Sequence, residues 1–232
     1  MNSNMTVTPF DLNLTADVEE IPLPYFDRHY YQIDNFYKNP HLLLEYFNTE
    51  CKYELFKKKL PNTRNGQEFS DKRHYGSNYY MHGVAEALKV VCGAKSFRND
   101  PKDIATNTFQ MHDRDYNNYN DNYWWPHLDH GWTALIYLNE GGCEGTNLYH
   151  KPNAPKMIAQ HGMDNLFRKG EEANSEHTNP WANRDEWILG GNIKSAFNRA
   201  IIFPSKIYHG QAVESDRWFD ETRINQVVFF NY

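Results

Sequence analysis

The chain has 232 residues, enough for one domain with a sizeable core, and 16% of them are aromatic. A formal net charge of −6, without a long basic run, argues against a nucleic-acid partner. The cysteines Cys51, Cys92 and Cys143 form no C-x-x-C pair, which argues against a disulfide framework or a zinc ribbon. No signal peptide and no apolar run of roughly 18 residues is visible, so we expect a cytoplasmic protein without a membrane span.

The N-terminal part of the chain predicts an arm, a strand and a helix. Residues 1–24 are polar with scattered apolar positions and are interpreted as either an early strand or an extended N-terminal arm. His29–Ile33 predicts a strand. Asn39-Pro40 is an N-cap followed by proline at the first helical position, so a helix should follow. The basic and polar stretch 52–76 predicts a loop.

A second helix is predicted further on, between a polar cap and a glycine. Ser77-Asn78 could cap it, and Cys92-Gly93 would end it. Its apolar residues recur at helical spacing: Met81, Val84, Ala87, Leu88 and Val91. Such helices commonly pack on the outer face of a sheet. Phe109–Met111 predicts a strand, and the polar run 113–125 would lie at the mouth of any site formed by the residues after it.

The C-terminal half has the rhythm of short strands separated by turn residues. The predicted strands are 132–138, 146–149, 193–203 and 224–230. Residues 151–192 break this rhythm and are interpreted as an insertion between two strands, either a lid or a surface elaboration, with a possible helix at Met157–Arg168. We therefore expect one domain over residues 1–232. Its fold class is mainly β with flanking helices, a double-stranded β-helix (jelly roll, cupin-like).

The clearest chemical motif is His127-x-Asp129, in the run Trp125-Pro126-His127-Leu128-Asp129-His130-Gly131. In a strand, residues i and i+2 point to the same face, so an imidazole and a carboxylate would project side by side. They are two thirds of the two-His-one-carboxylate set that binds non-haem Fe(II) and leaves positions open. In a chain with 11 histidines the pair alone also fits a solvated loop. His130 would point away from it.

A third ligand has to come from elsewhere in the chain. His209 is the best candidate, because it follows closely after the apolar run Ala200–Phe203. Arg223 comes next and opens the strand-like stretch 224–230. Four other histidines have no second candidate ligand at a metal-binding spacing and are not expected to bind metal: His112, His150, His161 and His177.

The order of these features is more specific than any one of them. His-x-Asp precedes a Tyr-Leu-Asn strand and a Gly-Gly-x-x-Gly-Thr turn, and a distal His and a strand-borne Arg follow. In this series, from Tyr30 to the C-terminus, the chain resembles the 2-oxoglutarate/Fe(II)-dependent oxygenases. Within them it is most similar to the prolyl 4-hydroxylase-like group, and there to small phage-encoded members, which would place it in the host cytoplasm.

The resemblance implies roles for individual residues. His127, Asp129 and His209 would hold Fe(II), with 2-oxoglutarate and O2 as cosubstrates. Arg223 would pair with the distal carboxylate of 2-oxoglutarate, for which its planar fork is suited. Many prolyl hydroxylases carry Lys at this place. The remaining cosubstrate candidates are Asn225, which shares the face of Arg223 but stands where many relatives have Ser or Thr, Thr146 in the Gly-Thr turn, and Tyr137, whose alternative role is core packing.

The implied reaction is hydroxylation of an unactivated C–H bond with release of succinate and carbon dioxide. Asp129 favours hydroxylation, because related halogenases carry a small residue in place of the carboxylate. A protein or peptidyl-prolyl side chain is the family-level substrate, but a free amino acid, a small metabolite or a modified nucleobase would fit the same site. The alternatives are a non-catalytic jelly-roll module that binds a ligand, and a cupin-like metalloenzyme that does not use 2-oxoglutarate.

Overall fold

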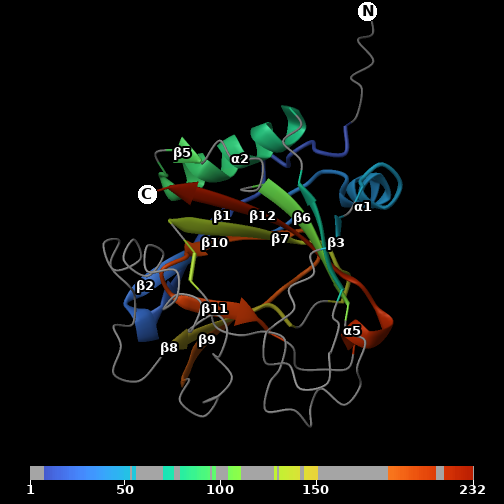
Figure 1. The fold of residues 1–232 in the computed structure, drawn as a ribbon. Coiled ribbons are helices and arrows are strands. Elements are labelled where there is room, and N and C mark those ends of the chain that lie inside the picture. The colour runs from blue at the N-terminus through green and yellow to red at the C-terminus, as the bar shows by residue number, and fades with distance from the viewer. Residues whose placement is uncertain are drawn as a thin grey trace, which may run out of the picture.

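The computed structural model describes residues 8–52, 54–55, 70–75, 79–94, 96–97, 104–110, 128–129, 131–141, 144–150, 188–212 and 217–231. This part of the chain consists mainly of antiparallel strands with few helices, as the sequence predicts (Figure 1). The strands form a large sheet and a small sheet, and the two helices α1 and α2 lie beside the large sheet on the side away from the small one (Figure 1).

The large sheet has nine strands in the described residues, ordered β1-β2-β10-β7-β12-β6-β4-β3, with β5 paired to β12. Their bounds are β1 Val18–Leu23, β2 Arg28–Ile33, β3 Glu54–Leu55, β4 Ser70–Tyr75, β5 Ser96–Phe97, β6 Ile104–Gln110, β7 Trp132–Tyr137, β10 Arg199–Pro204 and β12 Arg223–Asn231. The small sheet has the order β11-β8-β9, with β8 Thr146–His150, β9 Ile188–Ile193 and β11 Tyr208–Gln211. The helices are η1 Pro24–Phe26, α1 Pro40–Thr49, α2 Tyr79–Cys92 and the single turn α5 Arg217–Asp220.

One face of the large sheet packs against the helices. Strand β7 alternates, so Ala134 and Ile136 point to this face and are fully buried there. Leu43 of α1 and Leu88 of α2 are fully buried in the same cluster. The apolar stripes predicted from helical spacing therefore do cover the outer face of the sheet.

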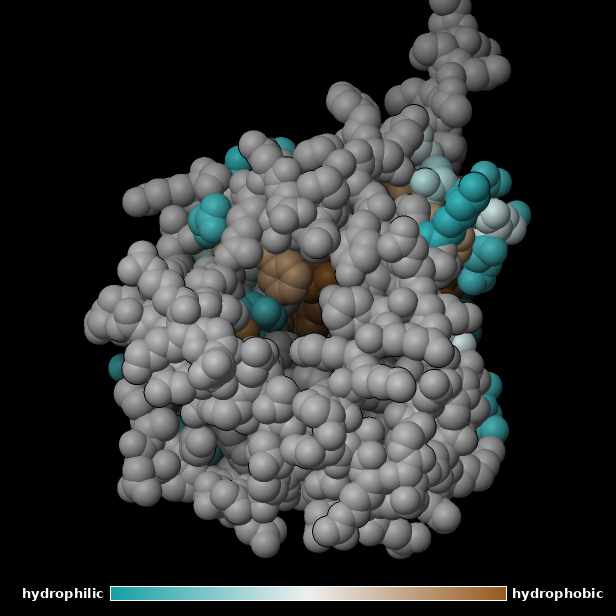
Figure 2. Space-filling model, in the orientation of Figure 1, coloured by the Kyte–Doolittle hydropathy of each residue, from teal (hydrophilic) through white to brown (hydrophobic). Residues whose placement is uncertain are grey.

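The other face of the large sheet forms an interior with the small sheet. Ile201 and Phe203 of β10 share a buried cluster with Leu148 of β8 and Ile193 of β9. This interior is not filled by apolar side chains alone. Figure 2 shows the molecule hollowed here, with hydrophobic and hydrophilic residues visible side by side in the opening. Titratable and hydrogen-bonding side chains on the inward faces of the strands point into this space.

Both predicted helix boundaries that the structure describes are confirmed. Pro40 is the first residue of α1, and Asn39 occupies the N-cap position, although its side chain makes no capping hydrogen bond. Helix α2 ends at Cys92, and Gly93 follows with a positive φ of 64°. Glycine is favoured there because the left-handed conformation strains residues that carry a Cβ.

Two segments differ from prediction. The stretch 52–76 is not all loop, because β3 and β4 lie within it, and β4 pairs with both β3 and β6. The predicted strand 193–203 is interrupted, because Ile193 ends β9 in the small sheet and β10 begins at Arg199 in the large sheet. Asn198 causes this break: it adopts a φ of 60°, and its side-chain amide exchanges two hydrogen bonds with the backbone of Tyr37, at 2.8 and 2.9 Å.

The polar run 113–125 and the helix predicted at Met157–Arg168 lie outside the described residues. Of the predicted insertion 151–192, only 188–192 is described, and it belongs to β9. Of the predicted arm, Val18–Leu23 forms β1, which pairs with β2. Among the helices that the structure describes, none has the length and apolar character to cross a membrane.

Candidate functional site

Asp129 stands just before β7, where backbone contacts fix its place. Its amide donates to the carbonyl of Ser205 at 3.1 Å, and the amide of Ser205 donates to the carbonyl of Gly131 at 3.0 Å. Gly131 has a φ of 71°, and a Cβ there would lie 1.8 Å from the carbonyl oxygen of Phe230. Only glycine fits this approach, so Gly131 lets the segment that carries Asp129 pack directly on β12.

His209 lies on β11 and is oriented by its surroundings. Its Nδ1 lies 2.8 Å from the carbonyl oxygen of Ile207. A carbonyl oxygen only accepts, so Nδ1 carries the hydrogen and, in the neutral ring, Nε2 carries the lone pair. The ring of Phe203 packs edge-on at a centroid distance of 4.9 Å. These contacts aim Nε2 into the interior.

The Nε2 atom of His209 lies 3.2 Å from Oδ2 of Asp129. A lone pair and a carboxylate oxygen at this distance repel each other unless a proton or a metal cation lies with them. Neutral imidazole and carboxylate are ligands of non-haem Fe(II), so the chemistry of this pair fits such an ion. Asp129 is 29% exposed in its side chain, which leaves the pair open on one side.

The third predicted ligand, His127, lies outside the described residues, as does His130. Within the described part of the chain, no group of three His, Cys, Asp or Glu side chains is gathered for a metal. The structure therefore brings Asp129 and His209 together, while the role of His127 stays a prediction. His150 is engaged elsewhere, since its Nδ1 lies 2.9 Å from the hydroxyl of Tyr25.

Arg223, the first residue of β12, points into the same interior and is only 6% exposed. Its Nη2 donates to the carbonyl of Gly145 at 3.2 Å, and its Cζ lies 5.8 Å from the centre of the Tyr137 ring. No carboxylate of the described residues forms an ion pair with it. Burial lowers the pKa of the Arg223 guanidinium, and the nearby Tyr137 and Glu144 partly oppose this shift.

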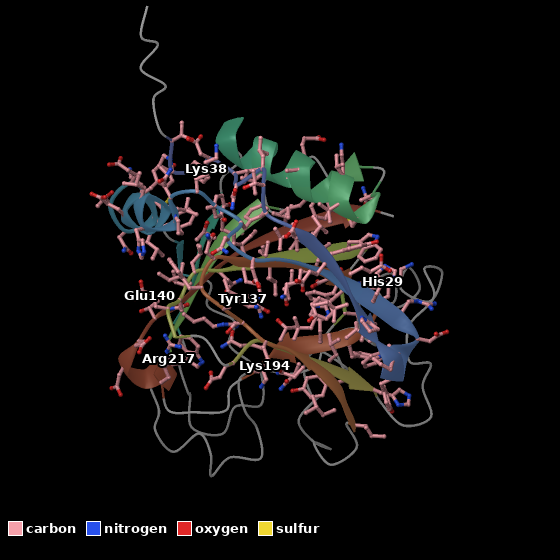
Figure 3. All side chains as sticks on the ribbon, turned by 180° about the vertical axis from the view of Figure 1, so that it is seen from behind. His29, Lys38, Tyr137, Glu140, Lys194 and Arg217 are labelled. Carbon is pink, nitrogen blue, oxygen red and sulfur yellow. The ribbon has the colours of Figure 1, made fainter. Side chains whose placement is uncertain are left out.

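Tyr137 and Thr146 form a hydroxyl pair below Arg223. The Tyr137 hydroxyl lies 2.8 Å from Oγ1 of Thr146, and Figure 3 shows Tyr137 between the two sheets. Burial raises the pKa of Tyr137 to about 12, against the opposing effects of the Arg223 charge and the Thr146 hydrogen bond. The Tyr137 phenol is therefore protonated at neutral pH. One hydroxyl of the pair donates to the other, which leaves a single O–H free to donate to an anion. The structure brings these three predicted cosubstrate residues together.

Asn225 faces the same interior, because it pairs with Tyr137 across the strands and lies two residues from Arg223. It is 8% exposed. Within the described residues, no hydrogen bond joins its side chain to Arg223. Its assignment to the cosubstrate pocket stays a prediction.

The segment before β8 contains Gly145, whose carbonyl contacts Arg223. A Cβ on Gly145 would lie 1.9 Å from the carbonyl oxygen of Ile193, so the close contact between β8 and β9 requires glycine. The Gly145 carbonyl also accepts from the amide of Ala212 at 3.0 Å. The carbonyl that receives Arg223 is thus fixed by the backbone of the neighbouring strand.

Sequence reasoning missed Glu144, Trp218 and Gln211. Glu144 is buried beside Gly145, and the indole Nε1 of Trp218 donates to its carboxylate. No local pattern marks these residues, because α5 and the turn meet only in the fold. Gln211 was detectable, since it lies two residues after His209 on the same face of β11.

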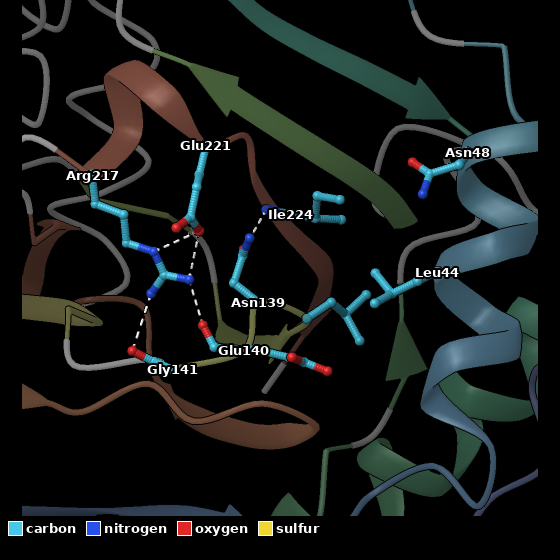
Figure 4. Close-up of a pocket in the computed structure, with 9 residues that line it drawn as sticks. Leu44, Asn48, Asn139, Glu140, Gly141, Arg217, Glu221 and Ile224 are labelled. Carbon is cyan, nitrogen blue, oxygen red and sulfur yellow. Dashed lines mark hydrogen bonds and ion pairs between the residues drawn. The ribbon is translucent and has the colours of Figure 1, made fainter.

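A separate pocket of about 730 Å³ lies outside this interior, between α1 and α5 (Figure 4). Arg217 crosses it and binds Glu221 at 2.7 Å, the carbonyl of Gly141 at 3.1 Å and the carbonyl of Glu140. Because Arg217 is engaged on three sides, it fastens α5 to the turn after β7. This contact supports the site from outside.

The chain was compared with known proteins and families. No curated protein matches it. A prolyl 4-hydroxylase structure from Phytophthora capsici is similar at 12% identity and a TM-score of 0.40, covering 85% of this chain and 57% of that one. A 2OG-Fe(II) oxygenase family oxidoreductase from Burkholderia pseudomallei is 10% identical, with a TM-score of 0.42 and coverages of 85% and 81%. A Pseudomonas putida prolyl-4-hydroxylase is 11% identical, with a TM-score of 0.40 and coverages of 94% and 92%.

The chain thus spans less than two thirds of the Phytophthora protein's length, but most of the length of the two bacterial ones. A family model gives the more direct assignment. It matches residues 15–224, nearly the whole chain, and its description is a family of unknown function, DUF6445. The chain belongs to the DUF6445 family.

Proposed function

We propose that this protein is an Fe(II)- and 2-oxoglutarate-dependent dioxygenase that hydroxylates an unactivated C–H bond. The observation that carries the proposal is the buried Arg223, which has no carboxylate partner among the described residues and shares an interior with the Asp129–His209 pair. A buried guanidinium without an anion is costly, so the site is built for one that arrives with the ligand.

Asp129 and His209 are proposed as two of the ligands of Fe(II), with His127 as the third. When bound, the iron would supply activation of O2 for the oxidative decarboxylation of 2-oxoglutarate and the hydroxylation of the substrate. The protein's own contribution is orientation. The carbonyl of Ile207 holds the hydrogen on Nδ1 of His209, so that Nε2 would face a bound metal, and the ring of Phe203 packs against the imidazole.

The cosubstrate is proposed to lie with its 2-oxo acid end at the metal and its other carboxylate at Arg223. Arg223 can present two parallel N–H groups to that carboxylate. The Tyr137 ring lies beside the guanidinium, and the free O–H of the Tyr137–Thr146 hydroxyl pair can donate to the same carboxylate. Asn225 is the proposed fourth contact from this side of the interior.

The fold is proposed to be a double-stranded β-helix. From β7 onward the described strands alternate between the sheets: β7 in the large sheet, β8 and β9 in the small, then β10 large, β11 small and β12 large. This path places β7, β11 and β12, with their inward side chains, around one interior.

The substrate is proposed to be a protein side chain, with peptidyl-proline as the first candidate. Cytoplasmic location and phage kinship stay predictions.

The test is an anaerobic titration of the metal-free protein with Fe(II) and then 2-oxoglutarate. We expect a weak visible charge-transfer band that needs both components, followed by succinate once oxygen is admitted. Metal binding without the band and without succinate would contradict the proposal. It would favour a cupin-like enzyme that uses no 2-oxo acid, or a non-catalytic binding module.

Single variants test the metal pair. Asp129→Ala and His209→Ala should lose the band and succinate formation while the fold is retained, as judged by circular dichroism. His29→Ala is the matched control, because His29 lies on β2 beside Glu20 and Tyr31, outside the interior. Full activity in either site variant would remove that residue from the metal centre.

A further inference from the structure

Two buried side-chain atoms lack a hydrogen-bond partner within the described part of the chain: Oδ1 of Asn192 and Nε2 of Gln211. An amide N–H that is removed from water and left unbonded costs free energy, so such groups in a folded protein call for an explanation. Gln211 is the last residue of β11, the strand that carries His209.

The register of the small sheet fixes the direction in which Gln211 points. It pairs with Thr146 of β8, as His209 pairs with Leu148. Paired residues of antiparallel strands lie on the same face. Thr146 and Leu148 both face the interior, where they contact Tyr137 and the buried cluster. Gln211 therefore faces the interior too.

Asn192 belongs to the opposite face of the same sheet. It pairs with Asn147, and its Nδ2 donates to Oδ1 of Asn147 at 2.6 Å. Asn147 alternates with Thr146 and Leu148 along β8, so both asparagines point away from the interior. Of the two unpartnered atoms, only that of Gln211 lies on the side of the proposed site.

The position of Gln211 along the strand matches one end of the proposed cosubstrate. It lies two residues from His209, which is about 7 Å along a strand. It is level with Thr146, whose hydroxyl bonds Tyr137 beneath Arg223. Gln211 thus stands beside Thr146 in the small sheet, and across the interior from Arg223 and Tyr137 of the large sheet, which are proposed to hold the carboxylate remote from the metal.

We propose that the side-chain amide of Gln211 donates a hydrogen bond to that remote carboxylate of 2-oxoglutarate, and so helps to select a dicarboxylic over a monocarboxylic 2-oxo acid. The inference rests on the proposed function. An N–H group can be satisfied only by an acceptor, and the acceptor that Arg223 draws to this place is a carboxylate. The ligand would give the guanidinium, which has no ion-pair partner among the described residues, a carboxylate, and would give the Gln211 amide an acceptor.

The experiment is anaerobic titration calorimetry of the Fe(II)-loaded protein, which measures binding without turnover. Gln211→Met keeps the length of the side chain and removes the donor. We expect the Kd for 2-oxoglutarate to rise about tenfold, as for the loss of one hydrogen bond to a charged group. The Kd for 2-oxopentanoate, which has the same chain length without the second carboxylate, should not change.

Two further variants sharpen the result. Gln211→Glu places a carboxylate beside the ligand's own, so it should weaken 2-oxoglutarate binding more than Gln211→Met does. Asn192→Ala removes an amide from the other face of the sheet and should leave both Kd values unchanged. Retained 2-oxopentanoate binding shows that each variant is folded.

Equal 2-oxoglutarate affinity in Gln211→Met and the natural protein would overturn the inference, and so would an equal loss for both ligands. If the natural Fe(II)-loaded protein does not bind 2-oxoglutarate, the proposed function itself fails, and the inference falls with it. These failures are distinguishable, because the second appears before any variant is made.

Discussion

Arg223 carries a buried positive charge, and the free-energy cost of burying it depends on which groups bind beside it. Its hydrogen bond to Gly145 and its contact with the Tyr137 ring offset only part of the desolvation cost. A site that keeps a cation in this state is less stable than one with an apolar residue, but it is preorganised for an anion. Affinity for the ligand is gained because the guanidinium needs no rearrangement on binding.

The substitution Arg223→Gln separates the effect of the buried charge on stability from its effect on affinity for the ligand. We expect the 2-oxoglutarate concentration for half-maximal succinate formation to rise ten- to a hundredfold, because a charge-assisted, bidentate contact is lost. Without ligand, urea unfolding should show equal or higher stability, since the buried charge is gone. Arg28→Gln, at the exposed first residue of β2, is the control for loss of one positive charge. An unchanged requirement for 2-oxoglutarate would exclude Arg223 from the cosubstrate pocket.

At this scale the order of the motifs along the chain, and the family resemblance that it carries, pointed to Asp129, His209 and Arg223, and the structure brings the first two within 3.2 Å of each other. The two-residue period of strands was applied to His127 and Asp129, but Asp129 lies before β7 and outside the described strands. Ile207 acts through its backbone carbonyl, which any residue type carries, so its contact with His209 leaves no mark in the sequence. Gly145 was visible as part of the glycine-rich turn, but the hydrogen bond from Arg223 to its carbonyl was not. Glu144 and Trp218 meet through tertiary contact alone.

At the scale of elements, the single turn α5 holds in place the Glu144–Gly145 segment that contacts Arg223. Arg217 fastens it to the turn after β7, and Trp218 binds the carboxylate of Glu144. Glu144 is the neighbour of Gly145 and lies close enough to oppose the lowered pKa of Arg223. The indole therefore holds a carboxylate that would otherwise be able to compete with the ligand for Arg223.

Trp218→Phe removes the indole donor while keeping an aromatic ring. We expect the free energy of unfolding to fall by about 1–3 kcal/mol, because a buried carboxylate loses a hydrogen bond. The Kd for 2-oxoglutarate should also rise, as Glu144 turns toward Arg223. Adding Glu144→Gln should restore the Kd, and a double-mutant cycle measures this coupling. Additive effects on the Kd would contradict the competition.

Elements with apolar periodicity were predictable, and polar ones were not. Helices α1 and α2 followed from caps and spacing. Strand β4, with the sequence SDKRHY, shows no apolar alternation, and its backbone pairing with β6 and β3 requires none. The break between β9 and β10 depends on Asn198, whose partner Tyr37 lies far away in the sequence.

The whole molecule contains buried tyrosines that link its stability to alkaline pH. Burial raises the pKa of Tyr37 well above its ordinary value of 10 and that of Tyr137 to about 12. The hydroxyl of Tyr37 also donates to Oε1 of Gln226 at 2.5 Å, inside the core. Both phenols are kept neutral by the folded state in a pH range where the unfolded chain ionises them.

Stability should therefore be complete below pH 10 and fall as pH rises from 10 toward 12. In that window the unfolded state binds fewer protons, and each such tyrosine contributes a loss of about 1.4 kcal/mol per pH unit. Urea unfolding at pH 8, 10 and 11 measures this. Tyr137→Phe should show a shallower decline between pH 10 and 11 than the natural protein. Identical slopes would mean that Tyr137 ionises equally easily in both states.

The pairing of β2 with β10 has a consequence for how the chain is made. The two strands are neighbours in the large sheet, yet β10 ends about 170 residues after β2. At a ribosomal rate of about 5–20 residues per second, β10 is synthesised roughly ten to thirty seconds after the β1–β2 hairpin. During that time the open edge of the hairpin can pair with other nascent chains. Yield in recombinant expression should therefore depend on chaperones and low temperature more than on the stability of the finished fold.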